Sequence, residues 1–437
     1  MSKQYSWGRY PAVQQRPVRL ASRHNRLPSI EPFLPYGLGR SYGDSCLCSH
    51  GHLLSSQSLD QFIQFDPKTG VLRCEAGVTL AEIIEVCLPH GWFLPVTPGT
   101  KYVTVGGAIG NDVHGKNHHS AGSFGNHVQA FELLRSDGSR LLCTESSNSE
   151  YFRATLGGLG LTGMITWAEL QLKSVTSRSL DVESIKYSRL SDFFSLSDET
   201  TDDWEYTVAW LDCTAKGNEL GRGHFIRGKH AESDSTQGLA PGMSIEHGSK
   251  LAFPVESPIS LINNLSVRAF NTLYYQRQRA NVVRSQQDYD PFFYPLDGIL
   301  NWNRMYGKQG FLQHQCVIPV DTAADAVEEM LKRISRAGMG SFLVVLKMMG
   351  AVASKGMMSF PMEGATLAMD FPFQGNKTLA FLDSLDEIVR EAGGRLYPAK
   401  DARMSADMFR SGFPAWQDVD ALRDPAITSD FWQRVAG

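Results

Sequence analysis

The sequence predicts an α+β protein with two domains. Its 437 residues exceed what one ordinary hydrophobic core organises. Two glycine-rich stretches with few long apolar side chains lie within the first 130 residues, and a strand-helix-strand-strand-helix-strand order occupies residues 311–397. We therefore expect a first domain that binds a ligand with its backbone, and a second domain built on an antiparallel sheet covered by helices.

Composition excludes several classes of protein. Hydrophobic residues make up 42% of the chain, charged residues 20%, and the net charge is −4 with scattered Lys and Arg, which argues against a nucleic-acid binder. The N-terminus lacks the apolar segment of a signal peptide, and no apolar run approaches the roughly 20 residues of a membrane span. Seven irregularly spaced cysteines are typical of free thiols. We expect a cytoplasmic protein.

The first glycine stretch, residues 34–44, reads LPYGLGRSYGD. It lacks the Gly-Lys-Ser/Thr of a phosphate loop, and Gly43 comes one place too late for a dinucleotide fingerprint. We interpret it as a turn-rich loop whose backbone donors, with Arg40 and Ser41, form a nest for a diphosphate.

Four potential metal ligands follow at alternate positions: Cys46, Cys48, His50 and His52. Zinc ligands usually come in pairs separated by a longer spacer. On an extended strand these four would share one face but could not converge on one ion. We expect no metal, and we interpret the segment as a surface hairpin.

Short elements are expected over residues 62–144. Two strands within 62–78 surround the turn 66–70, and Thr79 with Glu82 forms a capping box that opens a helix ended by Pro89 and Gly91. Strands at 128–135 and 139–144 flank the turn 136–138.

The second glycine stretch, residues 98–127, holds seven glycines and four histidines. Glycine offers no side chain to bury, so this run favours a backbone that approaches a flat or anionic ligand closely, which we take to be a large cofactor. The spacing of His114, His118, His119 and His127 does not indicate a metal site.

A G-x-G-x-x-G match at Gly158, Gly160 and Gly163 does not indicate a Rossmann site. That motif follows a strand and opens a helix. Here a helical segment (150–156) precedes the glycines and an alternating strand (164–172) follows them. We expect these glycines to let the backbone pass close to the same cofactor.

The second domain begins with weak patterning. Residues 176–204 are polar and serine-rich, and residues 214–260 are weakly patterned. Both spans are what we expect of an inserted domain with surface loops. Strands at 311–319, 342–348, 366–371 and 395–397, with a helix capped by Thr322 and another at 378–391, then predict a ferredoxin-like half-sandwich with one face covered by two helices. No internal repeat is visible.

Polar residues on this sheet have two interpretations. On the strand 311–318, Gln313 and Gln315 share one face, which is either solvated or closes over a polar ligand. In the second case Lys347 and Trp210 would join them. Lys400 follows the last strand, where the chain returns to the first domain, and ligand sites favour such junctions.

Three blocks of sequence together resemble the vanillyl-alcohol-oxidase (PCMH) type of FAD-binding domain: residues 37–44, 98–109 and 114–127. Within that superfamily the chain is most similar to the decaprenylphosphoryl-β-D-ribose 2-oxidase family, the flavoprotein half of an epimerase that makes polyprenylphosphoryl arabinose. The similarity runs from residue 7 to residue 401 and includes 301–307, 311–315 and 394–401.

The resemblance implies an FAD site and its residues. Arg40 stands where many relatives carry a histidine bonded to the flavin, so we expect non-covalent FAD. The implied cofactor-binding residues are Tyr36, Gly37, Leu38, Gly39, Arg40, Ser41, Tyr42, Gly43, Asp44, Gly99, Thr104, Val105, Gly106, Gly107, Asn111, Asp112, Val113, His114, Ile165 and Tyr397.

The resemblance also implies an activity: oxidation of the 2-hydroxyl of a polyprenylphosphoryl-β-D-ribose to the 2-keto sugar, by hydride transfer to the flavin. Lys400 is the expected base, with His114 second, and Tyr42 helps to orient the substrate. Gln313, Gln315, Lys347 and Trp210 are the expected substrate-binding residues. Ala368 and Thr366 depart from one member of that family, the target of covalent inhibitors, in which a cysteine and an asparagine stand at these positions.

The sequence leaves two alternative functions open. The chain could instead oxidise a free aldonolactone or alditol, or serve as a flavin-binding partner subunit without turnover. We expect a domain arrangement of 1–175 (FAD-binding), 176–394 (substrate-binding) and 395–437 (return to the FAD domain). A short-chain dehydrogenase that reduces the keto intermediate with NADH is the expected partner, with peripheral contact at the inner membrane implied by a lipid-linked substrate.

Overall fold

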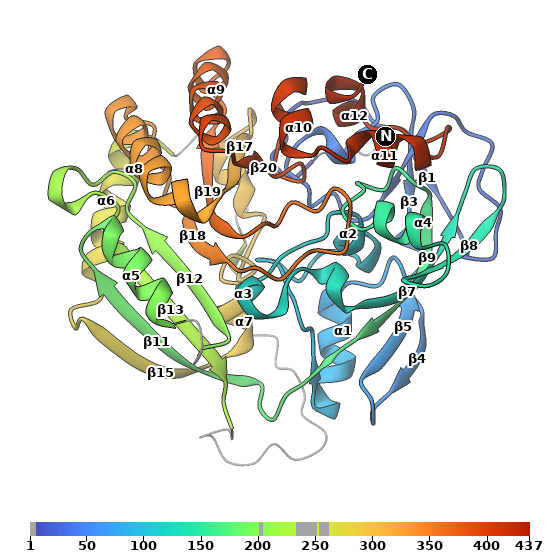
Figure 1. The fold of residues 1–437 in the computed structure, drawn as a ribbon, viewed down its shortest axis with the longest axis horizontal. Helices are drawn as coiled ribbons and strands as arrows, with labels where there is room; N and C mark the ends of the chain where they lie inside the picture. The colour runs from blue at the N-terminus through green and yellow to red at the C-terminus, as the bar shows by residue number, and fades with distance from the viewer. Residues whose placement is uncertain (1–5, 201–203, 233–250, 253–261) are drawn as a thin grey trace.

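The computed structural model describes residues 6–200, 204–232, 251–252 and 262–437. Two halves lie side by side, the N-terminal half on the right and the half built on the large sheet on the left (Figure 1). Part of the weakly patterned span 214–260 lies outside the described residues. The α+β class expected from the sequence is confirmed.

The N-terminal half contains two sheets. The first is parallel, in the order β1-β3-β2: β1 (Pro17–Arg19), β3 (His52–Ser55) and β2 (Phe33–Tyr36). The second is antiparallel, in the order β4-β5-β9-β7-β8: β4 (Phe62–Asp66), β5 (Val71–Glu75), β9 (Met164–Gln171), β7 (Val128–Leu134) and β8 (Arg140–Thr144).

The hairpin expected around Cys46–Cys48 was wrong. His52 begins a strand that pairs in parallel with both of its neighbours, and Cys48 is buried in the core. A parallel pair needs a long crossover, so a local alternation of polar residues could not reveal it.

Two helices of the N-terminal half lie where the sequence predicts them. Helix α1 (Leu80–Cys87) carries the Thr79–Glu82 capping box. Helix α4 (Ser149–Thr155) precedes Gly158, and β9 follows Gly163, which confirms that this glycine motif opens no helix. The expectation that the second glycine stretch builds no core element was wrong. It forms α2 (Val105–Gly110) and α3 (His118–Ala121), and the apolar Val105, Ala108 and Ile109 of α2 are buried in the core.

The second half is built on one antiparallel sheet of eight strands. In spatial order they are β15 (Val282–Asp288), β11 (Ser179–Tyr187), β13 (Gly223–His230), β12 (Tyr206–Leu211), β18 (Val344–Met349), β19 (Gly364–Pro372), β17 (Phe311–Ile318) and β20 (Arg395–Leu396). Its main helices are α5 (Leu190–Thr200), α6 (Asn264–Gln276), α8 (Val320–Ala337) and α9 (Asn376–Glu391).

The ferredoxin-like prediction is confirmed, and the same unit occurs twice. The unit β17-α8-β18-β19-α9-β20 has the order β20-β17-β19-β18, with its fourth strand beside its first. The earlier segment β11-α5-β12-β13-α6-β15 has the same order, and β12 pairs with β18 to join the units. The sequence shows no repeat because the units share topology rather than residues.

Two further expectations for this half were wrong. Residues 176–200 and 223–230 are not surface loops but a strand, a helix and a second strand. Thr322 does not cap α8, which begins at Val320 after Pro319; instead the Thr322 hydroxyl donates to the carbonyl oxygen of Ala392 at 2.8 Å.

The C-terminal segment packs against the N-terminal half through α10 (Ala406–Gly412), α11 (Trp416–Leu422) and α12 (Asp430–Val435). Helix α11 contacts α4, and α12 contacts the turn Asp44–Cys46. We propose the division 1–175, 176–394 and 395–437, noting that β20 still belongs to the large sheet. In the described part of the chain, no helix is long and apolar enough to cross a membrane.

Candidate active site

Polar side chains collect on one face of the large sheet. Strand register aligns Gln313 with Asp370 and Gln315 with Ala368, while Lys347 lies opposite Thr366. Because directly paired residues point to the same side, all of these side chains share the face turned away from the core that contains Leu312, Cys316 and Ile318. Both glutamines are buried, so the face is not solvated.

His114 is the point where this face meets the glycine-histidine stretch. Its Nδ1 lies 2.8 Å from Lys347 Nζ, and its Nε2 lies 2.9 Å from the Gln315 amide. Lys347 also donates to the carbonyl oxygen of Gly115 at 2.7 Å. The two halves of the molecule therefore touch through polar groups.

The His114 ring is held neutral. Burial, together with the charge of Lys347, keeps the pKa of His114 well below its usual value. If Lys347 donates to Nδ1, the ring proton sits on Nε2, and the Gln315 amide oxygen can accept it after a 180° rotation of the amide. Both ring nitrogens are then engaged, which suits His114 to positioning.

A second polar cluster surrounds Tyr42. Lys400 Nζ lies 3.7 Å from the centre of the Tyr42 ring, and the Gln313 amide is within hydrogen-bonding range of the Tyr42 hydroxyl. Burial raises the pKa of Tyr42 well above its usual value, and Asp370 adds to the effect. Tyr42 therefore stays a neutral phenol that can donate a hydrogen bond.

Asp370 is the carboxylate of this cluster. Its side chain is fully buried, Oδ1 accepts from Gln313 Nε2 at 2.5 Å, and Oδ2 has no partner among the described residues. Burial raises the pKa of Asp370 to about 7, although Gln313 and Lys400 oppose the shift. The unpaired Oδ2 is free to accept a proton or a hydrogen bond.

Asp370 was not among the residues predicted from the sequence. The available signal was a single carboxylate within β19, whose other residues are apolar or small apart from Thr366. A buried, isolated charge is costly unless a partner compensates it. Such a residue within a core strand indicates function or a buried pair.

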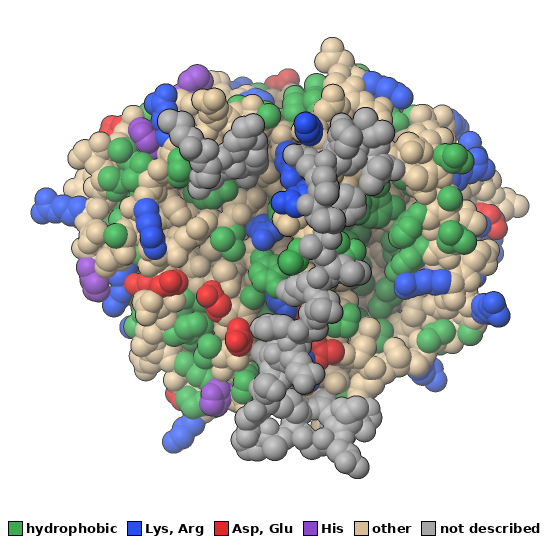
Figure 2. Space-filling view, turned by 180° about the vertical axis from the view of Figure 1, so that it is seen from behind, with side chains coloured by type: hydrophobic (Ala, Val, Ile, Leu, Met, Phe, Trp, Pro, Cys, Tyr) green, Lys and Arg blue, Asp and Glu red, His purple; other side chains and the backbone are tan. Residues whose placement is uncertain are grey.

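Lysines near the site are unusually ready to lose a proton. Burial lowers the pKa of Lys400 to about 8, while Asp370 opposes the shift. Burial also lowers the pKa of Lys347 to about 7, with repulsion from Lys116 and Lys400 contributing, and that of Lys116 to about 8. Lys and Arg side chains gather along the middle of the face seen from behind (Figure 2). A bound anion would relieve this repulsion.

The loop after β2 offers a row of backbone donors. Among the described residues, the main-chain N–H groups of 37–41 have no hydrogen-bond partner, whereas Tyr42 N–H donates to the carbonyl oxygen of Ala399 at 2.8 Å. Arg40 stacks on Trp7, and its Nε is buried without a partner. A run of free N–H groups beside a cation fits a diphosphate.

The two glycine stretches lie against each other. A Cβ on Gly37 would come within 2.4 Å of the Thr104 Oγ1, which caps α2 by accepting from Gly107 N–H at 3.1 Å. Beside Gly99, a Cβ would meet nothing within 4 Å. The donor loop, a close-packed glycine wall and open space together fit the diphosphate of a dinucleotide cofactor.

Gly43 allows the approach that places Lys400. A Cβ on Gly43 would lie 1.6 Å from the carbonyl oxygen of Asp401, so no other residue fits there. Arg434 secures the same junction, pairing with Asp44 and Asp401 at 2.8 Å. Lys400 is thus fixed above Tyr42 by its backbone neighbours.

Asp112 organises the second stretch. Oδ2 accepts from the hydroxyls of Ser123 at 2.7 Å and Ser359 at 2.5 Å, and Oδ1 accepts from Gly125 N–H at 2.7 Å. Ser359 belongs to the loop 350–363, which crosses from the large sheet to the N-terminal half (Figure 1). Asp112 therefore acts as a structural anchor between the halves.

The remaining expected cofactor residues lie around these loops. Tyr397 stacks on Phe360 at 4.4 Å, and its hydroxyl donates to the carbonyl oxygen of Asn111 at 3.0 Å. Val105, Val113 and Ile165 share one core cluster, so their side chains support the loops from below.

Trp210 lies apart from the His114 cluster. It pairs with Val345, its Nε1 donates to the carbonyl oxygen of Phe342 at 3.0 Å, and its ring packs on Tyr274. It occupies the same sheet face as Lys347 but no hydrogen bond or ring contact joins it to His114 among the described residues.

The other loop histidines make local contacts. His119 and His127 each place a ring nitrogen near a main-chain oxygen, and His118 is buried with no hydrogen-bond partner for its ring in the described residues. Within the described ranges, no three His, Cys, Asp or Glu side chains are placed to hold a metal.

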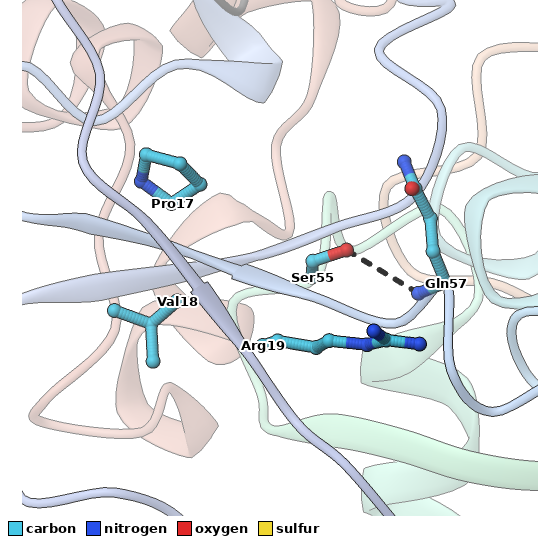
Figure 3. Close-up of a pocket in the computed structure, with 5 residues that line it drawn as sticks. All are labelled: Pro17, Val18, Arg19, Ser55 and Gln57. Carbon is cyan, nitrogen blue, oxygen red and sulfur yellow. Dashed lines mark hydrogen bonds between the residues drawn. The ribbon is translucent and has the colours of Figure 1, made fainter. Parts of the chain in front are cut away.

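An open cavity of about 340 Å³ is lined by Pro17, Val18, Arg19, Ser55 and Gln57 (Figure 3). Gln57 reaches the first glycine loop, donating from Nε2 to the carbonyl oxygen of Gly37 at 3.0 Å. The cavity contains none of the groups of the two polar clusters, and we assign it no chemistry.

Comparison with known proteins agrees with this geometry. Residues 14–144 match the model of the FAD binding domain family. This range contains both glycine stretches and the row of free N–H groups, so the dinucleotide cofactor is FAD.

Known relatives match over different lengths. The chain is 37% identical to decaprenylphosphoryl-beta-D-ribose oxidase of Mycolicibacterium smegmatis, covering 91% of this chain and 88% of that protein. It is 33% identical to mouse L-gulonolactone oxidase over 31% of this chain and 30% of that protein, and 33% identical to human Delta(24)-sterol reductase over 26% and 22%. The last two matches cover less than a third of either chain.

Proposed function

Because the chain belongs to the decaprenylphosphoryl-β-D-ribose oxidase family and is an FAD-dependent oxidoreductase, we propose that it oxidises the 2-hydroxyl of a polyprenylphosphoryl-β-D-ribose to the 2-keto sugar. This would be the first half of an epimerisation to the arabinose form. The observation that carries the proposal is the buried Lys400–Tyr42–Gln313–Asp370 cluster beside the FAD-binding loop.

Lys400 is the base in this proposal. Its pKa of about 8 leaves a useful neutral fraction at physiological pH, and a neutral amine can take the proton of the sugar hydroxyl. When bound, FAD supplies the two-electron acceptor for the hydrogen on the same carbon. Asp370 holds the pKa of Lys400 up, and it compensates the charge that Lys400 gains.

Other polar groups of the site orient the substrate and the His114 ring. Tyr42 and Gln313 can hold the sugar hydroxyls near Lys400, while Gln315 and Lys347 fix the His114 ring at the junction of the two halves. Hydride transfer requires a narrow approach geometry, so such positioning contributes to the rate. Trp210 would contribute a wall farther along the same sheet face.

We propose that FAD is bound without a covalent bond, by the predicted residues around the two glycine stretches. Arg40 has no nucleophilic nitrogen available, since its guanidinium stays charged in proteins and here stacks on Trp7. The row of N–H groups at 37–41 supports placement of the diphosphate there.

Oxidation of a free aldonolactone is the second candidate, supported by the partial match to L-gulonolactone oxidase. The longer match to the ribose oxidase and the polar sheet face favour the lipid-linked sugar. A short-chain dehydrogenase that reduces the keto sugar with NADH is the partner that an epimerisation requires, and we expect both to work at the membrane surface that holds the lipid.

Analysis of the reaction product tests the proposal. The purified holoenzyme is incubated in air with a prenylphosphoryl ribose, and the product is reduced with borodeuteride. We expect ribose and arabinose products that both carry deuterium at C2. Deuterium at another carbon, or turnover of free lactones alone, would contradict it.

A further inference from the structure

Helix α6 presents an apolar face that no described part of the chain covers. Leu265 is 80% exposed, Leu273 is 72% exposed and Phe270 is 43% exposed. At 100° per residue these three, with the exposed Ala269, fall on one continuous arc of the helix. Single exposed leucines are common on surfaces, but a group on one helix face marks an interaction site.

The opposite stripe of α6 is firmly packed. Asn271 donates to the Asp212 carboxylate and to the carbonyl oxygen of Ser341, both at 3.1 Å, and the Tyr275 hydroxyl donates to the carbonyl oxygen of Tyr187 at 3.2 Å. The helix is therefore held in place by its inner stripe. Its apolar arc is a fixed outer surface.

The charged residues that the α6 segment itself carries are all arginines. Residues 264–279 contain Arg268, Arg277 and Arg279 and no Asp or Glu. Arg279 lines a surface pocket with Asp192 and Glu199 of α5, whereas Arg268 and Arg277 are not among the residues of that pocket. Hydrophobic side chains alternate with Lys and Arg on the right of Figure 2, the side on which α6 lies. A helix with an apolar face flanked by arginines suits an anionic lipid surface.

A row of aromatic rings connects this arc to the candidate active site. Phe270 contacts Phe342 at 5.7 Å, Phe342 contacts Tyr306 at 6.1 Å, and Tyr306 stacks on Phe311 at 4.3 Å. Phe311 contacts Tyr42 at 5.4 Å, and Lys400 lies over that ring. The row is an apolar boundary between the site and the outer face of α6.

We propose that the exposed face of α6 docks on an anionic lipid bilayer, with Leu265, Phe270 and Leu273 entering the headgroup region and the arginines meeting lipid phosphates. The aromatic row then guides the prenyl chain of the substrate from the bilayer to the site. The second statement rests on the proposed function; the docking itself does not.

Vesicle binding tests the docking. The holoenzyme is sedimented with vesicles of phosphatidylcholine and phosphatidylglycerol that contain no substrate. We expect Leu265→Glu with Leu273→Glu to weaken binding at least about tenfold, and Arg268→Gln with Arg279→Gln to weaken it by about fivefold for each arginine removed. Pure phosphatidylcholine should bind the wild type less tightly.

A matched control separates docking from general charge effects. Val86→Glu with Leu142→Glu adds the same two charges at partly exposed apolar positions of the N-terminal half, and should leave vesicle binding unchanged. Equal binding by the α6 variant and the wild type, or no wild-type binding at all, would overturn the proposal. So would a change from dimer to monomer in sedimentation velocity with vesicle binding unaffected, because a second copy would then cover α6.

Failure of the proposed function is recognised separately. Bleaching of the wild-type flavin by a water-soluble, short-chain prenylphosphoryl ribose needs no vesicles. If bleaching is absent while vesicle binding depends on α6, the docking stands and the substrate is wrong. If the flavin bleaches but vesicle binding does not depend on α6, the docking proposal is wrong and the proposed function stands.

Discussion

Replacing Asp370 by asparagine tests the electrostatics of the site most sharply. Asparagine has nearly the same shape, and its amide oxygen can still accept the hydrogen bond from Gln313. The substitution removes the negative charge that raises the pKa of Lys400. The pKa of Lys400, near 8 in the wild type, should therefore fall further.

The fall in the pKa of Lys400 determines how the pH dependence of kcat/KM should change. If neutral Lys400 is the base, kcat/KM rises with pH through the Lys400 pKa, near pH 8 in the wild type. Loss of a nearby opposite charge moves such a pKa by about one unit, equal to about 1.4 kcal/mol. In Asp370→Asn the rising limb should shift to lower pH by that amount.

The assay is the pH dependence of flavin reduction by substrate in anaerobic stopped flow. Asp297→Asn serves as a control, because that carboxylate is buried beside Arg40 and Lys101 rather than Lys400. The rising limb of the pH profile of Asp297→Asn should stay at the wild-type pH. An unmoved limb in Asp370→Asn would refute the coupling, and a rate that falls as pH rises would show that charged Lys400 is the active form.

Four other outcomes are expected. Lys400→Ala should keep its flavin and lose turnover by about 10³-fold; unchanged turnover would remove Lys400 from the mechanism. Ala368→Cys places a thiol at a partly exposed position beside Gln315. After treatment with iodoacetamide, native mass spectrometry should show one adduct on this variant. It should show none on the wild type, because burial raises the pKa of all seven of its thiols. Arg434→Gln removes the ion pairs of the buried carboxylates Asp44 and Asp401 and should cost about 3 kcal/mol, seen as a lower Tm. Lys332→Gln at an exposed pair should have little effect. Acid precipitation should release all flavin into the supernatant, and flavin retained in the pellet would contradict non-covalent binding.

The order of helices and strands could be predicted from the sequence because local sequence signals determine it. The Thr79–Glu82 capping box, the alternation in β17 and the turn residues between β7 and β8 each act within a few residues. The parallel pairing of His52–Ser55 and the doubled ferredoxin-like unit depend on contacts between distant segments, and no local pattern specifies them.

The candidate site was partly predictable from the sequence, because some of its features also have local sequence signals. Glycine density marked the two backbone loops, and the paired glutamines marked the sheet face. Asp370 was missed because its importance depends on its interaction with Lys400. Lys400 comes thirty positions later in the sequence, after helix α9, and only the folded chain brings the two residues together. The α6 surface was missed because exposure of Leu265 and Leu273 is a property of the folded chain.

Anaerobic bleaching of the bound flavin shows whether a prenylphosphoryl ribose or a free sugar derivative reduces it. The oxidised holoenzyme is titrated, without oxygen, with a prenylphosphoryl-β-D-ribose and in parallel with free aldonolactones and alditols. We expect full loss of the visible flavin band at one equivalent of the prenylphosphoryl sugar and little change with the free compounds. Bleaching by a free lactone or alditol, with none by the prenylphosphoryl ribose, would contradict the proposed function.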